Sequence, residues 1–185
     1  MALILITGPA RSGKSDWAEY LAEQIAERNQ QQVVYIATAL AIEADEAWQA
    51  RIEKHRQRRP THWQCKEVPT DLSKVITQAA EGDCLLIDSL GTWLANLIDQ
   101  TQEDWEMSQA QLLSVLDKAS ADIVIVAEET GWGVVPAYKL GRRFRDRLGT
   151  LSRKIGAIAT DAYLATGGYA INISQLGTLI PARER

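Results

Sequence analysis

Residues 8–15 read Gly-Pro-Ala-Arg-Ser-Gly-Lys-Ser and match the pattern G-x-x-x-x-G-K-[ST] at every fixed position. An apolar run, Leu3 to Ile6, precedes this segment, and residues 16–26 follow it with helical spacing of apolar side chains. A buried strand, a glycine-bounded turn and a helix start therefore follow one another. Glycine lets the backbone approach closely, so that consecutive N–H groups can surround a phosphate. A chance glycine turn before a helix is the alternative, and the flanking segments disfavour it.

Each residue type in this segment has a physical role. Lys14 is expected to reach the β- and γ-phosphates of a nucleotide and to act in catalysis, and the Ser15 hydroxyl is expected to ligate Mg²⁺. The helix that begins near Lys14 adds the partial positive charge of its N-terminus. The pattern predicts nucleotide contacts at Gly8, Pro9, Ala10, Arg11, Ser12, Gly13, Lys14 and Ser15.

Length and composition limit the class of protein. A chain of 185 residues suits one domain, residues 1–185, with a full-sized core. The net charge of −4 disfavours a nucleic-acid partner. Cys65 and Cys84 are far apart, which argues for a reducing compartment and against a disulfide scaffold or a zinc site. We find no basic leader and no apolar stretch long enough for a membrane span, so we expect a cytoplasmic protein.

Apolar strands alternate with helices along the chain. This alternation predicts an α/β fold of the P-loop NTPase type, with a mostly parallel sheet and helices on both faces. Gly167-Gly168 suits a hairpin turn and predicts an antiparallel pair at the C-terminal end of the sheet. The expected strands are residues 3–6, 33–36, 63–68, 84–87, 123–127, 162–165 and 169–173, and the expected helices include residues 14–28, 43–56 and 138–159.

A nucleotide site of this type also needs a carboxylate at the end of a neighbouring strand, to hold Mg²⁺ directly or through water. Two strands offer one. Asp88 follows Leu85-Leu86-Ile87 and is our choice for the metal, while Glu128-Glu129 follow the competing strand. We expect Glu129, beside a glycine loop, to face the second substrate or the site of catalysis. The alternative for either strand is a solvated acid at the start of a loop.

His55, one of two histidines, ends the expected helix 43–56 and is followed by Arg56, Gln57, Arg58 and Arg59. A neutral imidazole can attack phosphorus as a nucleophile, and guanidinium groups can hold the phosphate. Spacing alone favours the alternative of a surface histidine on a basic helix end. A second basic cluster, residues 142–147, is either a solvated face or a site for an anionic substrate. Trp132 lies in a glycine loop, where it can pack against a large ligand.

Several segments together resemble the bifunctional adenosylcobinamide kinase / adenosylcobinamide-phosphate guanylyltransferase family of cobalamin biosynthesis. The resemblance covers almost the whole chain, with a departure at Gly91, where threonine is frequent in the family. The resemblance is specific because the phosphate loop of residues 8–15 occurs together with the segment around His55 and the glycine-rich segment 129–136. The matching segments are Gly8 to Ser15, Tyr35 to Ala39, His55 with Arg59-Pro60, Asp88-Ser89-Leu90 and Glu129 to Pro136.

The resemblance implies a two-step enzyme, typically a homotrimer, that uses Mg²⁺ with ATP and GTP as substrates. A nucleoside triphosphate phosphorylates the hydroxyl of adenosylcobinamide. GTP then guanylylates the histidine that falls at His55, and this group passes GMP on to give adenosylcobinamide-GDP. The resemblance places nucleotide contacts at the loop and at Ala37, Thr38, Ala39, Arg56, Gln57, Arg58, Arg59, Glu67 and Asp88.

Two other functions compete with this one. The first is a P-loop kinase of another small alcohol, in which His55 is structural. The second is a nucleotide-binding switch without transfer chemistry. The sequence also leaves open whether ATP or GTP donates the phosphoryl group.

Overall fold

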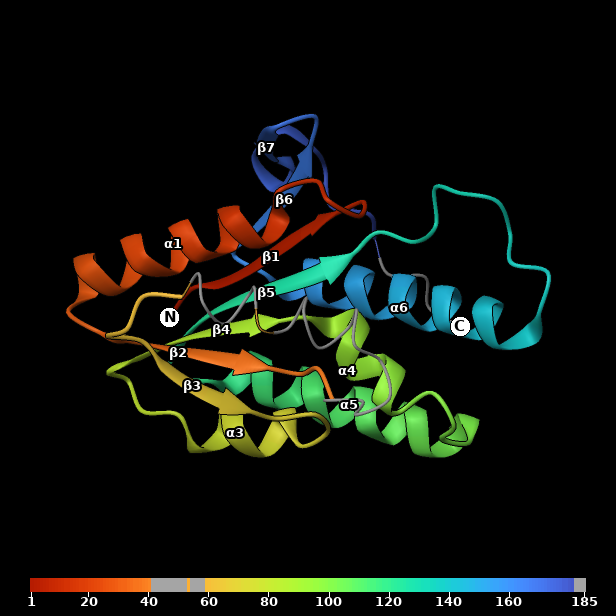
Figure 1. Cartoon of the computed structure of the whole chain (residues 1–185), viewed down its shortest axis with the longest axis horizontal. Helices are drawn as coiled ribbons and strands as arrows, with labels where there is room; N and C mark the ends of the chain where they lie inside the picture. Colours follow the sequence, from red (N-terminus) through yellow and green to blue (C-terminus); the bar gives the residue numbers. More distant parts are fainter. Residues whose placement is uncertain (41–52, 54–58, 182–185) are drawn as a thin grey trace.

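The computed structural model describes residues 1–40, 53 and 59–181 (Figure 1). The expected helix 43–56 lies outside the described residues apart from residue 53. The same holds for four predicted site residues, which are His55, Arg56, Gln57 and Arg58.

One sheet runs through the described part of the chain. Its strands are β1 (Leu3–Gly8), β2 (Gln32–Ala37), β3 (Gln64–Glu67), β4 (Asp83–Asp88), β5 (Asp122–Glu128), β6 (Asp161–Thr166) and β7 (Tyr169–Asn172). Their order across the sheet is β3-β2-β4-β5-β1-β6-β7. Every neighbouring pair is parallel except β6 and β7, which form the antiparallel hairpin. The predicted C-terminal hairpin is therefore confirmed.

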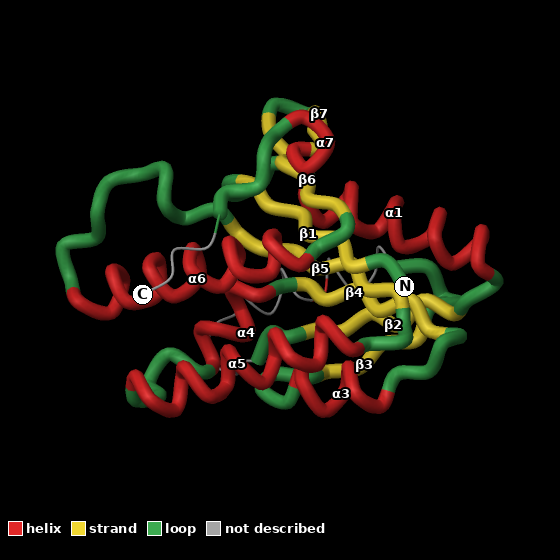
Figure 2. Tube along the Cα trace, turned by 180° about the vertical axis from the view of Figure 1, so that it is seen from behind, coloured by secondary structure: helices red, strands yellow, loops and turns green. Residues whose placement is uncertain are grey.

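Helices cover both faces of this sheet, as predicted (Figures 1 and 2). Helix α1 packs on one face and α3, α4, α5 and α6 on the other, while the short α7, which we did not predict, follows the hairpin. The bounds are α1 (Lys14–Asn29), α3 (Leu72–Gln78), α4 (Leu90–Asn96), α5 (Gln102–Lys118), α6 (Lys139–Ile158) and α7 (Ile173–Leu176). No helix in the described ranges combines the length and hydropathy that a bilayer span requires.

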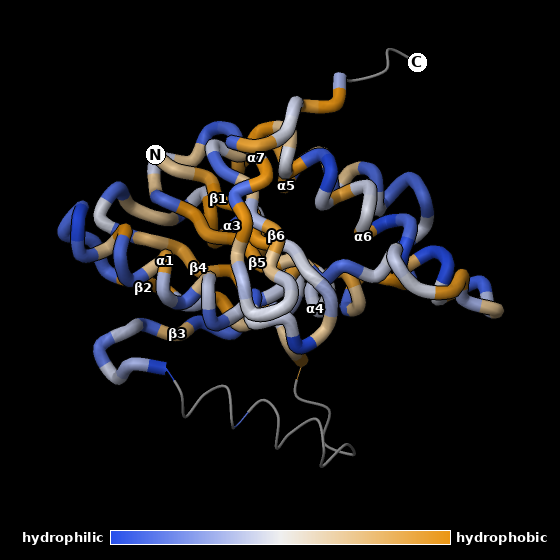
Figure 3. Tube along the Cα trace, turned by 90° about the horizontal axis from the view of Figure 1, so that it is seen from above, coloured by the Kyte–Doolittle hydropathy of each residue, from blue (hydrophilic) through white to orange (hydrophobic). Residues whose placement is uncertain are grey.

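The alternation of side chains along β1 divides the core into two layers. Ile4 and Ile6 pack toward α1, whereas Leu3 and Leu5 pack toward the other helices. The central strands are apolar on both faces, and Figure 3 shows this concentration of apolar residues in the middle of the fold. A strand buried on both faces cannot alternate polar and apolar residues, which is why the strands read as continuous apolar runs.

The burial of the two cysteines predicts their reactivity. Cys84 is fully buried, and burial raises the pKa of its thiol to about 12, with Asp122 and Glu23 acting in the same direction. Cys65 is exposed. Because the thiolate is the reactive form, we expect a disulfide reagent at pH 8 to modify Cys65 rapidly and to modify Cys84 only in denaturant. Thiol counting on the folded protein and on Cys65→Ser measures this, and a rapid reaction in Cys65→Ser would contradict the assigned burial.

Candidate active site

The loop between β1 and α1 begins at a crowded point. Gly8 lies opposite Glu128 in the register of β1 with β5, and its carbonyl accepts a hydrogen bond from the Glu129 N–H at 2.8 Å. A Cβ atom at Gly8 would lie 2.3 Å from the Ala165 carbonyl oxygen and 2.7 Å from the Ser12 hydroxyl. Only glycine therefore allows the end of β1 to fit between its two neighbouring strands.

Gly13 begins α1 in a left-handed conformation, with φ of +88°. Its carbonyl accepts the Trp17 N–H at 2.9 Å, which closes the first helical turn. Gly13, at the N-cap position, has no side chain with which to cap this helix terminus. Since the first N–H groups of a helix have no intrahelical partners, this terminus can bind an anion.

Lys14 lies over the loop that precedes it. The side chain is 8% exposed, and its ammonium group donates a hydrogen bond to the Pro9 carbonyl at 3.2 Å. This contact keeps the positive charge beside the loop N–H groups, where a phosphate oxygen can replace the carbonyl as its acceptor.

The position of Asp88 differs from our expectation. Strand β5 lies between β1 and β4, so Asp88 ends the next strand but one from the loop, and the neighbouring strand ends in Glu128. Parallel strands are about 4.8 Å apart, which puts the backbone of Asp88 about 10 Å from β1. At this distance the Asp88 carboxylate is better placed to contact a metal at the loop through a bridging water than to ligate it directly.

Asp88 is held by Tyr35, whose hydroxyl donates to the carboxylate at 2.7 Å. The pKa of Tyr35 is raised above its ordinary value, mainly by burial and further by the charge of Asp88, whereas Arg59 opposes this shift. The hydroxyl therefore remains a donor. The Arg59 guanidinium lies 3.6 Å from the centre of the Tyr35 ring, which brings this predicted contact close to Asp88.

Glu128 takes part in a network that the sequence analysis did not anticipate. Its carboxylate accepts hydrogen bonds from the Ser89 hydroxyl at 2.5 Å and from the Gly91 N–H at 2.9 Å. A Cβ at Gly91 would lie 2.1 Å from this carboxylate, so the glycine leaves room for it. Glu128 thus binds the start of α4, while the neighbouring Glu129 carboxylate accepts the Gly131 N–H. The Glu-Glu pair was visible in the sequence, but its partners were not.

Thr38 is buried and faces the same network. Its hydroxyl donates to the Ser89 carbonyl at 2.8 Å and accepts the Ser89 N–H at 2.9 Å. The Asn96 amide donates to the Thr38 carbonyl at 2.8 Å. The side chain of this predicted nucleotide contact thus joins β2 to the start of α4, and Ala37 and Ala39 flank it, half-buried.

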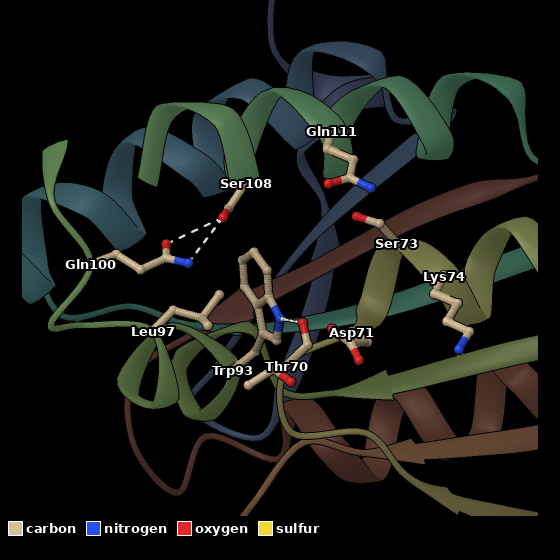
Figure 4. A pocket seen from close by; sticks show the side chains of 9 residues that line it. All are labelled: Thr70, Asp71, Ser73, Lys74, Trp93, Leu97, Gln100, Ser108 and Gln111. Carbon is tan, nitrogen blue, oxygen red and sulfur yellow. Dashed lines mark hydrogen bonds between the residues drawn. The ribbon is translucent and has the colours of Figure 1, made fainter. Parts of the chain in front are cut away.

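The structure brings the predicted residues together in part. The loop, Asp88, Glu128 and Glu129 share the carboxyl edge of the sheet, where ligands bind in open α/β folds. Glu67 is exposed at the end of β3, the outermost strand on the β2 side, in register with Ala37. Figure 4 shows a separate groove of about 400 Å³ beside α3, α4 and α5, where the Trp93 indole donates to the Thr70 carbonyl at 2.7 Å. No phosphate-loop residue lines this groove.

Comparison with known proteins gives a consistent result. The family model described as cobinamide kinase / cobinamide phosphate guanyltransferase matches residues 4–173. The bifunctional adenosylcobalamin biosynthesis protein CobU of Escherichia coli K12 is 34% identical over 186 residues, which cover 92% of this chain and 99% of that protein. The bifunctional adenosylcobalamin biosynthesis protein CobP of Pseudomonas aeruginosa is 43% identical over 155 residues, which cover 82% of this chain and 85% of that protein.

Solved structures are similar in fold alone. The flagellar accessory protein FlaH of Methanocaldococcus jannaschii is 17% identical with a TM-score of 0.50, and the match covers 91% of this chain and 74% of that one. A second solved structure, of an ATPase domain, is 12% identical with a TM-score of 0.51, over 87% and 68%. Together with the loop and the sheet order, these likenesses show the predicted P-loop NTPase fold.

The crowding around Gly8 predicts an effect on stability. Gly8→Ala should lower the free energy of unfolding by about 1–3 kcal/mol, because the added methyl meets the backbone of β6. Gly82→Ala is the matched control, since nothing lies within 4 Å of the point that its Cβ would occupy. Urea denaturation of both variants measures the difference, and equal midpoints would show that β6 does not enclose Gly8 as described.

Proposed function

This chain belongs to the cobinamide kinase / cobinamide phosphate guanyltransferase family, and we propose that it catalyses both reactions of that name. In the first, a nucleoside triphosphate phosphorylates the hydroxyl of adenosylcobinamide. In the second, GMP passes from GTP to the new phosphate and gives adenosylcobinamide-GDP. The observation that carries this proposal is the family match over residues 4–173, which includes the phosphate loop between β1 and α1.

In the kinase step, the loop N–H groups and Lys14 hold the β- and γ-phosphates. The substrate hydroxyl oxygen attacks the γ-phosphorus and loses its proton to the solvent, the bond to the bridging oxygen breaks, and the nucleoside diphosphate leaves. Lys14 then exchanges the Pro9 carbonyl, its acceptor at 3.2 Å, for a phosphate oxygen. Glu129, which directly follows β5 and donates its N–H to the Gly8 carbonyl, is the carboxylate that we expect to face the acceptor hydroxyl.

Mg²⁺ fits this edge of the sheet. Proteins usually hold this ion with one or two carboxylates or hydroxyls, phosphate oxygens and water. Ser15, in the first turn of α1, and Asp88, through water, would hold it. When bound, the ion neutralises charge on the phosphates.

In the guanylyl step, an imidazole nitrogen of His55 attacks the α-phosphorus of GTP. A phosphorus–nitrogen bond forms and pyrophosphate leaves. A phosphate oxygen of the phosphorylated corrinoid then attacks the same phosphorus and frees the histidine. Arg56, Arg58 and Arg59 supply positive charge for these groups. The assignment of His55 rests on the family resemblance, because this residue lies outside the described ranges.

The loop between β5 and α6 suits a large acceptor. Trp132 is 64% exposed and Val134 is 95% exposed, so this loop presents apolar surface next to Glu129. We propose that it contacts the corrinoid. We also propose a homotrimer, as in the family, whose protomer is a single domain of residues 1–185 that acts in the cytoplasm, where its two unpaired thiols stay reduced.

The proposed intermediate predicts a covalent adduct. After incubation with GTP and Mg²⁺, intact-protein mass spectrometry should show the protein with one added GMP. His55→Asn should lose this adduct and the GDP-linked product but should still phosphorylate adenosylcobinamide. The adduct should be labile in acid and stable in alkali, as a phosphorus–nitrogen bond is.

The other histidine provides the control. His62 is exposed and pairs with Glu23 at 2.9 Å, so His62→Asn should still form the adduct. If His55→Asn accumulates guanylylated protein, the nucleophile lies elsewhere. If the parent protein forms no adduct but phosphorylates the corrinoid, the chain is a kinase without the second step.

The role of Lys14 predicts a loss of rate. Lys14→Ala should slow phosphorylation about a hundredfold to a thousandfold, since one charged contact at a transition state contributes about 3–4 kcal/mol. Lys118→Ala, at the exposed end of α5, should retain the parent rate. Steady-state kinase assays measure both variants, with thermal unfolding as a check on folding. Unchanged kinase rates in Lys14→Ala would refute the assignment of the loop.

A further inference from the structure

A second feature adjoins the phosphate loop on the β6 side, away from Asp88 and Glu128. A cavity of about 350 Å³ lies between the start of α1 and the β6–β7 hairpin. Ser12 and Gly13 of the loop line one side, Asp16 and Trp17 of α1 are part of the wall, and Gly168 and Tyr169 close the other side. Its volume falls in the range of small-molecule pockets, which is about 300–1,000 Å³.

The order of the strands gives a direction to any nucleotide bound at the loop. Strand β1 has β5 and its carboxylates on one side and β6 on the other (Figure 1). Because the γ-phosphate must meet the acceptor near Glu129, the unreactive end of the nucleotide extends away from β5. The cavity lies at that end, and it is continuous with the loop because Gly13 belongs to both.

The wall suits a planar aromatic ring. Trp17 stacks on Tyr20 with ring centres 5.3 Å apart and meets the edge of Tyr163 at 5.7 Å, so its indole is held in a fixed orientation. Trp17 is half-buried, so part of its ring is open to the cavity that it lines.

The hairpin places a second ring at the mouth of the cavity. Gly167 and Gly168 have φ values of +58° and +83°, which L side chains rarely adopt, and they make the turn tight. Tyr169 follows at once and is 77% exposed, although it borders a cavity. A tyrosine ring in this position has an open face for stacking.

We propose that this cavity receives the purine base of the nucleoside triphosphate that donates the phosphoryl group. This inference rests on the proposed function, because it requires phosphates at the loop. The proposal also gives the phosphoryl donor and the GTP of the second step different base sites. The donor base lies on the β6 side, whereas the family resemblance places GTP contacts at Ala37 to Ala39, Glu67 and Asp88, on β2, β3 and β4 across β1.

Two ligands, one with a base and one without, distinguish binding of the base from binding of the phosphates. The affinities of ATP and of inorganic tripolyphosphate, each with Mg²⁺, are measured by calorimetry on the full chain. Tyr169→Ala should weaken ATP binding about fivefold to a hundredfold, as expected for one lost base–aromatic stack, and should leave tripolyphosphate binding unchanged. Tyr169→Phe should restore ATP binding. Tyr138, before α6, is 70% exposed, and Tyr138→Ala should bind both ligands like the parent protein.

Each contrary result has a distinct meaning. If the parent protein binds neither ligand, the phosphate loop and the proposed function fail together. If it binds both and Tyr169→Ala keeps the parent affinity for ATP, the base site is refuted while the loop stands. A change in oligomeric mass in Tyr169→Ala with unchanged ATP affinity would show that a second copy covers Tyr169 instead. If Tyr169→Ala loses GTP-dependent adduct formation to the same extent as it loses ATP affinity, the two nucleotides share one base site, and the proposed separation is refuted.

Discussion

The site depends on how β1 is held between β5 and β6. Hydrogen bonds on both sides fix its register, with Gly8 opposite Glu128 and Thr7 opposite Leu164. The missing Cβ of Gly8 admits the Ala165 carbonyl at the point where the chain leaves the sheet. The phosphate loop therefore starts from a buried strand that is paired on both sides. The strand spacing of about 4.8 Å then sets how far the backbones of the other strand ends lie from this loop.

Strand β1 divides the carboxyl edge into two chemically different parts. On one side, Glu128 and Ser89 anchor α4, and Tyr35 orients Asp88. On the other side, Trp17 and Tyr169 form an aromatic wall. A nucleoside triphosphate has charged phosphates at one end and a flat ring at the other. In our proposal, Mg²⁺ offsets the repulsion between the carboxylates and the phosphates on one side, and the aromatic side chains hold the base on the other.

Local signals explain what the sequence predicted correctly. The loop, the buried strands and the Gly167-Gly168 turn each depend on a few adjacent residues. The order of strands does not, because β4 and β5 are equally apolar runs, and only packing decides which lies beside β1. Ser89 and Glu128 are 39 positions apart, so their contact left no pattern to read. The aromatic cavity likewise joins Trp17 to Tyr169 across almost the whole chain.

The proposed pair of reactions gives a reason for two base sites. Phosphoryl transfer requires the attacking and leaving oxygens to be roughly in line. In the kinase step the nucleoside diphosphate leaves, so its base must lie away from the acceptor, on the β6 side. In the guanylyl step pyrophosphate leaves, so the nucleophile must approach the α-phosphorus from the nucleoside end. A loop fixed by β1 cannot turn to serve both geometries. Two nucleoside triphosphates bound in turn, with their bases on opposite sides of β1, would present the γ-phosphorus of the first and the α-phosphorus of the second on the β5 side of the loop.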